Sequence, residues 1–259
     1  MLANTRRLFS SARRASCVAM LSIVSLMGCL PKADVLAPLP DGGIRVLFVG
    51  NSLTYFNNLP GTLIDLALTT GDTINSVVVA FPDYALVDHL RQGSAVQVIA
   101  GTSWNFVVLQ QGPSSVQVNR DSLIEMTRLF DGPIRRAGAR TSLFSVWPQT
   151  GNAATFPRAI ESYQLAATAV GGVYLPVGAA WQVALAEDAT IPLYDGDGLH
   201  PSPLGTYLAA LVMYERFTFK DCRLLPAQAV VDNRVLTDVP ERVVRRLQEI
   251  AHGTSVLTP

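Results

Sequence analysis

The sequence has few cysteines, few histidines and no cluster of basic residues in its main part. Only three of its 259 residues are cysteine: Cys17, Cys29 and Cys222. The first two lie in a segment interpreted below as a leader and anchor, which leaves Cys222 alone in the folded domain. A lone cysteine excludes an internal disulfide and a metal site built on cysteine, and its own role is left open.

An excess of charge of one sign is also lacking. The chain has 20 basic and 20 acidic residues, so its formal net charge is zero. Four of the basic residues lie in the first 29 residues, which contain no acid: Arg6, Arg7, Arg13 and Arg14. The remainder is mildly acidic, with 16 basic against 20 acidic residues. We therefore expect no nucleic-acid partner.

Several motifs of cofactor and metal enzymes are missing. The chain has no phosphate-binding loop, no G-x-G-x-x-G dinucleotide fingerprint and no H-E-x-x-H zinc motif. It also lacks the G-x-S-x-G turn of α/β-hydrolases, because Thr54 stands where the second glycine should follow Ser52. The sequence therefore implies no organic cofactor and no metal.

Residues 1–28 are predicted to be a signal peptide. Their arginines precede an apolar run at about residues 15–27, which is shorter than the roughly 20 residues that a membrane-spanning helix needs. The run ends in Gly28-Cys29, which resembles a bacterial lipobox, where the cysteine is lipidated and becomes the first mature residue. An ordinary signal peptide with a chance cysteine is the alternative.

Lipidation of Cys29 would attach the protein to a membrane and place it in the bacterial cell envelope, on the periplasmic side of the outer membrane. Residues 29–43 contain several prolines and few periodic apolar positions, so we interpret them as the lipidated cysteine and a tether. Residues 44–259 form the predicted single domain, and their apolar content is sufficient for one substantial core.

Short apolar runs alternate with helical patterns along this domain. Strands are expected at 46–49, 74–81, 104–109, 141–146 and 173–176. Helices are expected at about 63–70, 85–100, 121–136, 156–170, 177–186, 204–217 and 240–251. Because strands that alternate with helices of this length form a parallel sheet, we predict an α/β fold: a three-layer α/β/α sandwich around five parallel strands.

Ser52 lies on the first turn after the first strand. The carboxyl edge of a parallel sheet is where open α/β folds bind their ligands, so this serine is a candidate nucleophile. The alternative is that Gly50-Asn51-Ser52 is only a turn that ends the strand.

An activated serine needs a base, and the chain has only three histidines. His89 falls within a helical pattern and is expected to be a packed or surface residue, while His252 near the last helix end suits a solvated cap. His200 lies in a glycine-rich loop three residues after Asp197, within reach of its carboxylate in a turn. The alternative is a capping loop in which Ser202 caps the following helix.

The order of these short motifs is similar to that of a known family. Gly50-Asn51-Ser52-Leu53 after a first strand, with Asp197-x-x-His200 in a late loop, resembles the SGNH-hydrolase (GDSL-like) superfamily of esterases. The resemblance runs from the first strand to the helix after His200. It implies a flavodoxin-like catalytic domain in which Ser52 is the nucleophile, His200 the general base and then acid, and Asp197 orients the imidazole.

The oxyanion hole of that family uses the serine N–H, a glycine N–H after the second strand and an asparagine side chain after the third. Here Pro82-Asp83-Tyr84-Ala85 takes the glycine position, so the resemblance implies a backbone N–H of Asp83 or a neighbour. The segment 111–115 is similar to the Gln-Gly-Glu-Ser-Asn stretch of sialate O-acetylesterase-like relatives, with serine in place of asparagine. Gln111 or Ser114 would then supply the third donor.

The resemblance therefore implies a serine esterase that cleaves small acyl esters, with O-acetylated glycans as one substrate class. The altered oxyanion positions leave a second hypothesis open. In that hypothesis the protein is a non-catalytic glycan-binding or scaffold lipoprotein of the envelope that retains the fold.

Overall fold

The computed structural model describes residues 42–257. The predicted signal peptide, the lipidation of Cys29 and nearly all of the tether lie outside these residues. Within residues 42–257, no helix combines the length and the apolar character needed to cross a bilayer.

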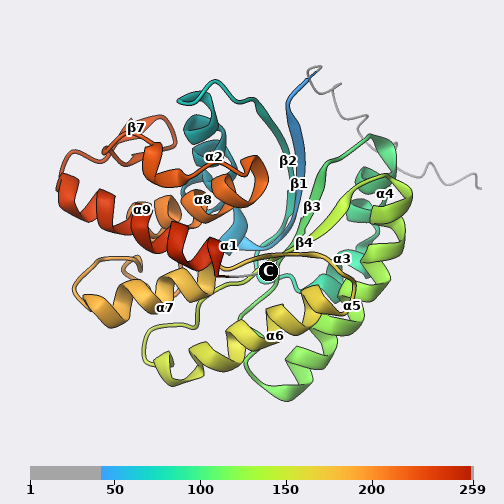
Figure 1. Ribbon diagram of the computed structural model, residues 1–259. Helices are drawn as coiled ribbons and strands as arrows, with labels where there is room; N and C mark the ends of the chain where they lie inside the picture. The colour runs from blue at the N-terminus through green and yellow to red at the C-terminus, as the bar shows by residue number, and fades with distance from the viewer. Residues whose placement is uncertain (1–41, 258–259) are drawn as a thin grey trace, which may run out of the picture. The chain divides into compact units, whose positions relative to one another are not determined.

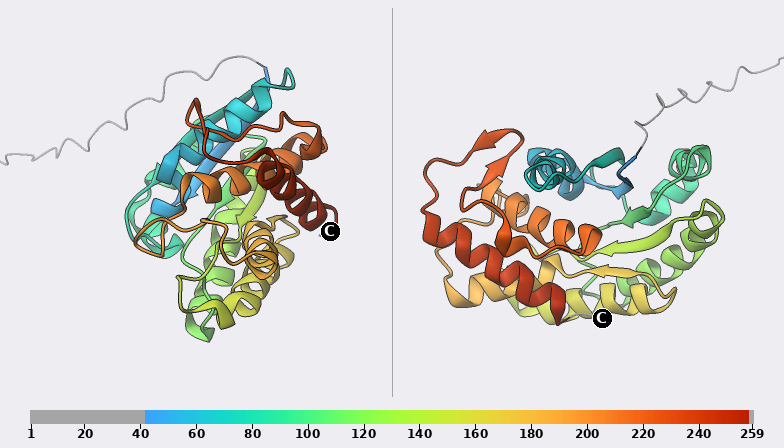
Figure 2. Two further views of the ribbon diagram at one scale, coloured as in Figure 1. Left: turned by 90° about the vertical axis from the view of Figure 1, so that its left-hand side faces the viewer. Right: turned by 45° about the horizontal axis from the view of Figure 1, so that its top comes forward.

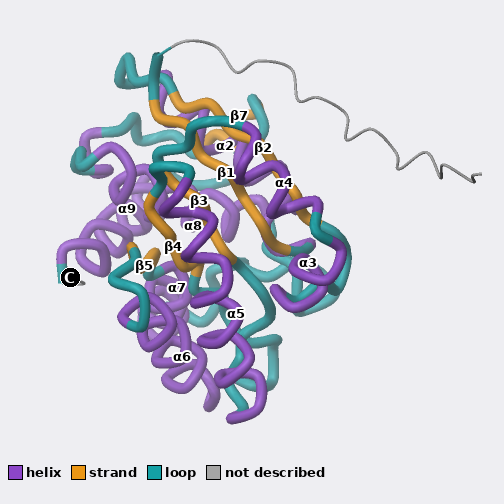
Figure 3. The backbone as a smooth tube through the Cα atoms, turned by 90° about the vertical axis from the view of Figure 1, so that its right-hand side faces the viewer, coloured by secondary structure: helices purple, strands orange, loops and turns teal. Residues whose placement is uncertain are grey.

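The central sheet has five parallel strands in the order β2-β1-β3-β4-β5. The strands are β1 (Ile44–Gly50), β2 (Ile74–Ala80), β3 (Phe106–Leu109), β4 (Arg140–Phe144) and β5 (Val173–Leu175). Helices cover both faces, so the predicted three-layer α/β/α fold is confirmed. Figure 3 shows the strands side by side in orange between the purple helices.

The strand order explains where a site can form. Strand β1 pairs with β2 on one side and with β3 on the other, so the chain changes direction across the sheet at β1. Its residues Val46–Val49 are fully buried, as expected for a strand covered on both faces. Ligand sites of open α/β sheets lie outside the carboxyl ends of the strands at such a point. Ser52 follows β1 there, and Gln110 follows β3.

The helices divide between the two faces of the sheet. Figure 1 shows α2, α8 and α9 on one side of the sheet and α3, α4 and α5 on the other. Both views of Figure 2 show α9, in red, beside α8. The helices are α1 (Ser52–Tyr55), α2 (Leu59–Leu68), α3 (Leu86–Gln92), α4 (Ser94–Gly101), α5 (Gln117–Arg136), α6 (Phe156–Thr168), α7 (Val177–Glu187), α8 (Pro203–Thr218) and α9 (Glu241–Val256).

Helix α8 is the most buried of these helices. It packs against α2, α7 and α9, and buried side chains occur all round it, as is usual for a helix enclosed in a core. Ser202 caps its start by accepting from Gly205 N at 3.1 Å. This fixed helix start holds the loop that carries His200.

Two local features differ from the sequence-based expectation. The helix expected at 85–100 is divided into α3 and α4 by Gly93, which has φ +83° and ends α3 in the left-handed conformation. A small hairpin, β6 (Val230–Val231) with β7 (Arg234–Val235), was not predicted. Its two turn residues, Asp232 and Asn233, both have positive φ, as two-residue hairpin turns of type I′ require.

Candidate active site

The turn that carries Ser52 follows β1 directly, and we call residues 50–54 the serine turn. Asn51 caps helix α1 because its Oδ1 accepts from Leu53 N at 3.1 Å. Ser52 is the first helical residue, so its own N–H has no acceptor inside the helix. That N–H is the first of the predicted oxyanion donors, and this geometry leaves it available.

Gly50 is required at this turn by close packing. A Cβ placed on Gly50 would lie 2.3 Å from Thr54 Oγ1 and 2.4 Å from Gln110 Oε1. Both distances are far below van der Waals contact, so a side chain would push these two polar groups away. The glycine therefore lets Gln110 approach the backbone of the serine turn.

His89 also contacts the serine turn, and the sequence did not predict this role. Its ring is fully buried, and its Nε2 donates to the Gly50 carbonyl at 2.7 Å. Burial lowers the pKa of His89, so the neutral imidazole is the stable form. A neutral ring that donates from Nε2 leaves Nδ1 as an acceptor, and Nδ1 has no partner among the described residues.

The segment after β2 forms a tight turn beside the serine turn. Tyr84 N donates to Phe81 O at 3.3 Å, and Asp83 has φ +61°. Proline followed by a residue of positive φ is the pattern of a type II turn. Asn51 Nδ2 donates to Tyr84 O at 3.1 Å, which ties this turn to the residue before Ser52.

The backbone N–H of Asp83 is the free donor of this segment. The N–H of Tyr84 bonds within the turn, and the N–H of Ala85 donates to Asp88 Oδ2 at 3.0 Å. No hydrogen bond of the Asp83 N–H occurs within the described residues 42–257. Of the backbone donors considered for this position, Asp83 is therefore the one left for an oxyanion, which stays a prediction.

Gln111 and Ser114 lie at the end of β3, where their side chains bond to each other and to the backbone of nearby residues. Gln111 Nε2 donates to Ser114 Oγ at 2.9 Å and to Asn119 O at 3.4 Å. Gln111 Oε1 accepts from Leu86 N at 3.2 Å, and Ser114 Oγ donates to Gly112 O at 3.0 Å. An oxyanion role for either side chain stays a prediction, and it would require this loop to give up internal hydrogen bonds.

His200 lies in a short hairpin, residues 193–202, which we call the histidine hairpin. A bridge between Tyr194 and Pro201 closes it, with Asp195 N donating to His200 O at 2.8 Å. Gly198 sits in its turn with φ +69°, a conformation that favours glycine. The hairpin is therefore a formed structure with its own backbone hydrogen bonds.

Neighbouring loops hold the histidine hairpin from outside. Trp147 Nε1 donates to Leu199 O at 3.0 Å, and Tyr194 OH donates to Pro148 O at 2.6 Å. Thr150 Oγ1 donates to Gly198 O at 2.6 Å. Trp147 itself is buried and stacked on Trp181, so these contacts lead back to the core.

Asp197 orients the imidazole of His200 in the way the sequence suggested. Asp197 Oδ2 lies 2.5 Å from His200 Nδ1, and Oδ1 accepts from the N–H of Leu199 at 2.8 Å and of His200 at 2.9 Å. The hydrogen bond from His200, aided by these backbone N–H groups, lowers the pKa of Asp197 to about 2. A carboxylate only accepts, so Nδ1 carries the proton and Nε2 remains an acceptor. Asp195 closes the turn through its backbone, because its O accepts from Gly198 N at 3.0 Å.

Phe56 and Asn57, which follow the serine turn, connect it to the histidine hairpin. The Phe56 ring stacks on the His200 imidazole with centroids 4.4 Å apart and an interplanar angle of 21°. Asn57 Nδ2 donates to Pro201 O at 2.8 Å and to Thr206 Oγ1 at 3.1 Å. Ser52 and Phe56 are four residues apart, which places them on one side of a helical turn. The structure thus brings Ser52, Asp197 and His200 into one region.

Within the described residues, no hydrogen bond joins the Ser52 hydroxyl to His200. Catalytic hydrogen bonds in unliganded enzymes are often long and shorten only when substrate binds. Phe56, four residues after Ser52 and stacked on the imidazole, is therefore the contact that relates the two residues in this unliganded structure.

Two cavities flank this region, and neither includes Ser52 or His200 in its lining. One of about 320 Å³ lies at the base of the histidine hairpin, lined by Pro192, Ser202–Leu204 and residues 235–239. The other, of about 270 Å³, lies beside the end of β3 and is lined by Ala85, Val87, Gln111–Ser114, Asn119 and Ser122. The second shares the Gln111–Ser114 loop with the predicted oxyanion region.

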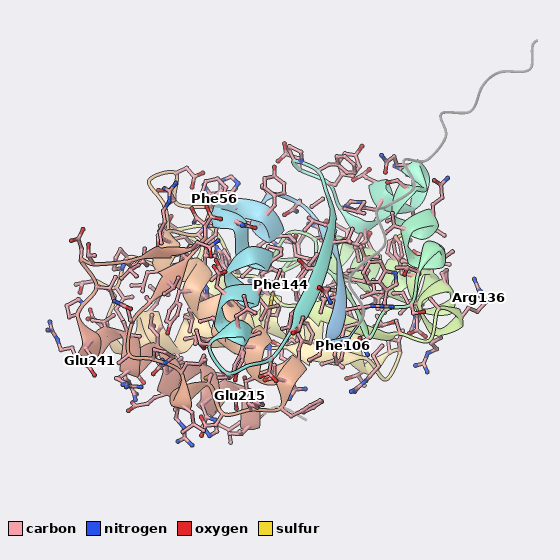
Figure 4. All side chains as sticks on the ribbon, turned by 90° about the horizontal axis from the view of Figure 1, so that it is seen from above. Phe56, Phe106, Arg136, Phe144, Glu215 and Glu241 are labelled. Atoms are coloured by element: carbon pink, nitrogen blue, oxygen red, sulfur yellow. The ribbon has the colours of Figure 1, made fainter. Side chains whose placement is uncertain are left out.

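One group of ligand-type residues lies away from the triad. Ligand atoms of Glu215, Asp221 and Cys222 lie within 4.8 Å of one another. Each has a protein partner: Glu215 pairs with His252 Nδ1 at 2.8 Å, Asp221 pairs with Arg223, and Cys222 Sγ donates to Gln248 O. Figure 4 places Glu215 and Phe56 on opposite sides of the view. Burial raises the pKa of the Cys222 thiol, so Cys222 is a packed, unreactive residue here.

No family model matches the sequence, and no curated protein matches it. Solved structures do match. A candidate SGNH hydrolase from Slackia heliotrinireducens is 28% identical, with a TM-score of 0.58 over 68% of this chain and 99% of that chain. A DUF4886 family protein from Bacteroides uniformis is 20% identical, with a TM-score of 0.68 over 83% and 95%. An acetylxylan esterase from Geobacillus stearothermophilus is 14% identical, with a TM-score of 0.52 over 69% and 96%.

The five-stranded sheet, with the serine turn after β1 and the histidine hairpin before α8, defines a hydrolase-type α/β/α domain. The two less similar structures support the fold alone. The fold, together with the more similar Slackia protein, supports membership of the SGNH-hydrolase (GDSL-like) superfamily. This relationship supports a hydrolase.

Proposed function

We propose that the protein is a serine ester hydrolase that cleaves small acyl esters through a covalent acyl-enzyme. The observation that carries the proposal is the Asp197–His200 pair at 2.5 Å, stacked on Phe56 one helical turn after Ser52. This arrangement leaves His200 Nε2 free to accept a proton, and in our proposal that proton comes from Ser52. A hairpin that served only to cap α8 would need Ser202 but would not need an oriented imidazole.

The reaction has two halves. Ser52 Oγ attacks the carbonyl carbon of the ester while its proton passes to His200 Nε2. When the tetrahedral intermediate collapses, the bond to the alcohol oxygen breaks and His200 returns the proton to the leaving alcohol. Water then attacks the acyl group, His200 takes a proton from it, and the proton goes back to Ser52 Oγ as the acid leaves. Asp197 keeps Nδ1 protonated and stabilises the imidazolium in both halves.

The negative charge on the carbonyl oxygen would be stabilised by the N–H groups of Ser52 and Asp83. Both donors lack a protein acceptor within the described residues. A donor of this kind is typically worth about 3 kcal/mol of transition-state stabilisation. With Gln111 and Ser114 bonded to each other, we expect a two-donor hole and modest turnover.

The substrate class is a small acyl ester, and O-acetylated glycans are our first choice. An acetylxylan esterase is among the proteins of similar fold, and a glycan would fit the proposed location in the envelope.

The lipid anchor at Cys29 is part of this proposal. Palmitate labelling of the parent and of Cys29→Ser tests it: label in the parent alone supports the anchor, and an unlabelled parent contradicts it.

The second candidate function is a non-catalytic glycan-binding or scaffold protein. It is favoured by the internal hydrogen bonds of Gln111 and Ser114, which leave the third oxyanion position without a free side-chain donor. Hydrolysis of p-nitrophenyl acetate by purified residues 30–259, with Ser52→Ala as control, separates the two. Turnover that disappears in Ser52→Ala supports the esterase, while equal background rates in both proteins support the scaffold.

A further inference from the structure

We infer that Gln110 is a positioning residue that holds the serine turn in its reactive conformation. This residue lies directly after β3, is fully buried and was not a site candidate from the sequence. For its effect on rate, the inference rests on the proposed esterase function. Its effect on the conformation of the serine turn does not.

Every hydrogen-bonding position of the Gln110 amide is occupied, and three of its four bonds go to the serine turn. Gln110 Oε1 accepts from Asn51 N at 2.8 Å and from Thr54 Oγ1 at 2.7 Å. Gln110 Nε2 donates to Asn51 Oδ1 at 3.0 Å and to the Gln111 carbonyl at 2.7 Å. The side chain therefore bonds the residue before Ser52 and the residue two positions after it.

These bonds fix the orientation of the turn as well as its place. Asn51 Oδ1 accepts from Leu53 N and from Gln110 Nε2 at the same time, so Gln110 holds the helix-capping side chain in position. The other end of that side chain, Nδ2, donates to Tyr84 O. Gln110 thus acts through Asn51 on the turn that carries the Asp83 N–H, and it links the ends of three strands.

The chemistry of an amide suits this role better than that of any other side chain. The serine turn presents two donors, Asn51 N and Thr54 Oγ1, next to one acceptor, Asn51 Oδ1. Only glutamine or asparagine offers both an acceptor and a two-proton donor on one planar group. Glutamate has the same shape, but its second oxygen would face the oxygens of Asn51 and Gln111.

The test compares two buried glutamines that each make several hydrogen bonds. Gln110→Met removes the amide at the serine turn. Gln248→Met is the matched control, because Gln248 is also fully buried, donates to Pro226 O at 3.0 Å and accepts from Arg245 at 3.1 Å. Both variants are measured at a temperature where circular dichroism shows them folded.

Two readouts are taken for each variant. The first is deuterium exchange of backbone amides in residues 46–56, which does not depend on catalysis. The second is kcat and KM for an aryl acetate, together with the rate of labelling by a fluorophosphonate. We expect Gln110→Met to speed exchange in residues 46–56 and to lower kcat and labelling by about 100-fold, with KM within about threefold. We expect Gln248→Met to leave all of these within about threefold.

Unchanged exchange in residues 46–56 of Gln110→Met, or a kcat within threefold of the parent, would overturn the inference. If the parent is inactive and unlabelled while Gln110→Met still speeds exchange, the proposed function fails and the structural role of Gln110 stands.

If Gln110→Met does not fold, two milder variants decide. Thr54→Val deletes one donor to Gln110 and should slow labelling by about threefold to tenfold. For Gln110→Glu, the measured quantity is the ratio of its labelling rate to that of the parent at the same pH. This ratio should rise as pH falls from 8 to 6, because a protonated glutamic acid regains one hydrogen-bond donor. Parent-like labelling of Thr54→Val, or a ratio for Gln110→Glu that stays low at both pH values, contradicts the inference.

Discussion

The serine turn is held by side chains from distant parts of the chain, whereas the histidine hairpin makes its functional contact, Asp197 with His200, within itself. Gln110 and His89, the residues that bond the serine turn, are fully buried and lie 39 or more positions away in the chain. Asp197 is three positions from His200, and its side chain is 49% exposed. The nucleophile thus depends on the sheet, and the base depends on a local turn.

This difference has a physical consequence. Buried polar groups are costly to leave unpaired, so a change near the serine turn should disturb both stability and rate. An exposed side-chain pair contributes little to stability, so a change at Asp197 should affect the rate far more than the fold.

Among the substitutions that test this contrast, the largest effect is expected at Asp197. In Asp197→Asn the amide can donate its N–H to His200 Nδ1 and favour the tautomer in which Nε2 cannot accept a proton. A comparable change in serine proteases costs about 10⁴ in turnover. We expect kcat/KM for an aryl acetate to fall by about 10² to 10⁴, while the Tm changes little.

Asp195→Asn is the matched control for Asp197→Asn. Asp195 contributes backbone atoms to the hairpin and is exposed, so this variant should stay within about tenfold of the parent, or about 1.4 kcal/mol. A crippled Asp195→Asn beside a near-normal Asp197→Asn would show that the wrong carboxylate has been assigned to His200.

Gly50→Ala should disturb the serine turn through packing. The new methyl group would overlap Thr54 Oγ1 and Gln110 Oε1, and overpacking of this kind typically costs about 1–3 kcal/mol. We expect lower stability in urea unfolding together with slower turnover of the folded fraction. Gly132→Ala is the control, since its nearest neighbour is the end of the Arg136 side chain at 3.4 Å. Equal effects of both changes would show that close packing does not require glycine at position 50.

The smallest effect is a pH dependence at His89. Burial lowers the pKa of this imidazole in the folded state, while the unfolded chain has a value of about 6.5. The unfolded state therefore binds more protons below about pH 6.5, so the stability that His89 contributes is present above that pH and is lost as pH falls.

Urea unfolding of the parent and of His89→Phe at pH 7.5 and pH 5 tests this dependence. The free energy of unfolding of the parent should fall more steeply than that of His89→Phe between the two values. Identical slopes would mean that His89 is not held neutral in the folded protein.

The same contrast explains what the sequence could predict. The five strands follow from short apolar runs, and the Asp197–His200 pair follows from a spacing of three within one loop. Gln110 was not identified because its partners lie 59 and 56 residues away and no local pattern marks the contact. His89 read as an ordinary helix residue because only the fold places it against the Gly50 carbonyl.

Some turns were also not predicted, although their residues are close together in the sequence. The division between α3 and α4 depends on Gly93 alone, within a pattern that otherwise continues as a helix. The hairpin turn at Asp232-Asn233 uses two residues that tolerate positive φ, but without glycine its pattern was too weak to predict β6 and β7. The oxyanion candidates Gln111 and Ser114 could be placed at the correct strand end, while their hydrogen bonds to each other could not be foreseen.

The central claim is that Ser52 is the nucleophile, and covalent labelling tests it most directly. The parent is treated with a serine-directed fluorophosphonate at pH 8, digested, and the adduct is mapped by mass spectrometry. We predict one adduct, on Ser52, that is absent from Ser52→Ala. An adduct on Ser114, Ser115 or Ser202, or equal labelling of Ser52→Ala, would contradict the account.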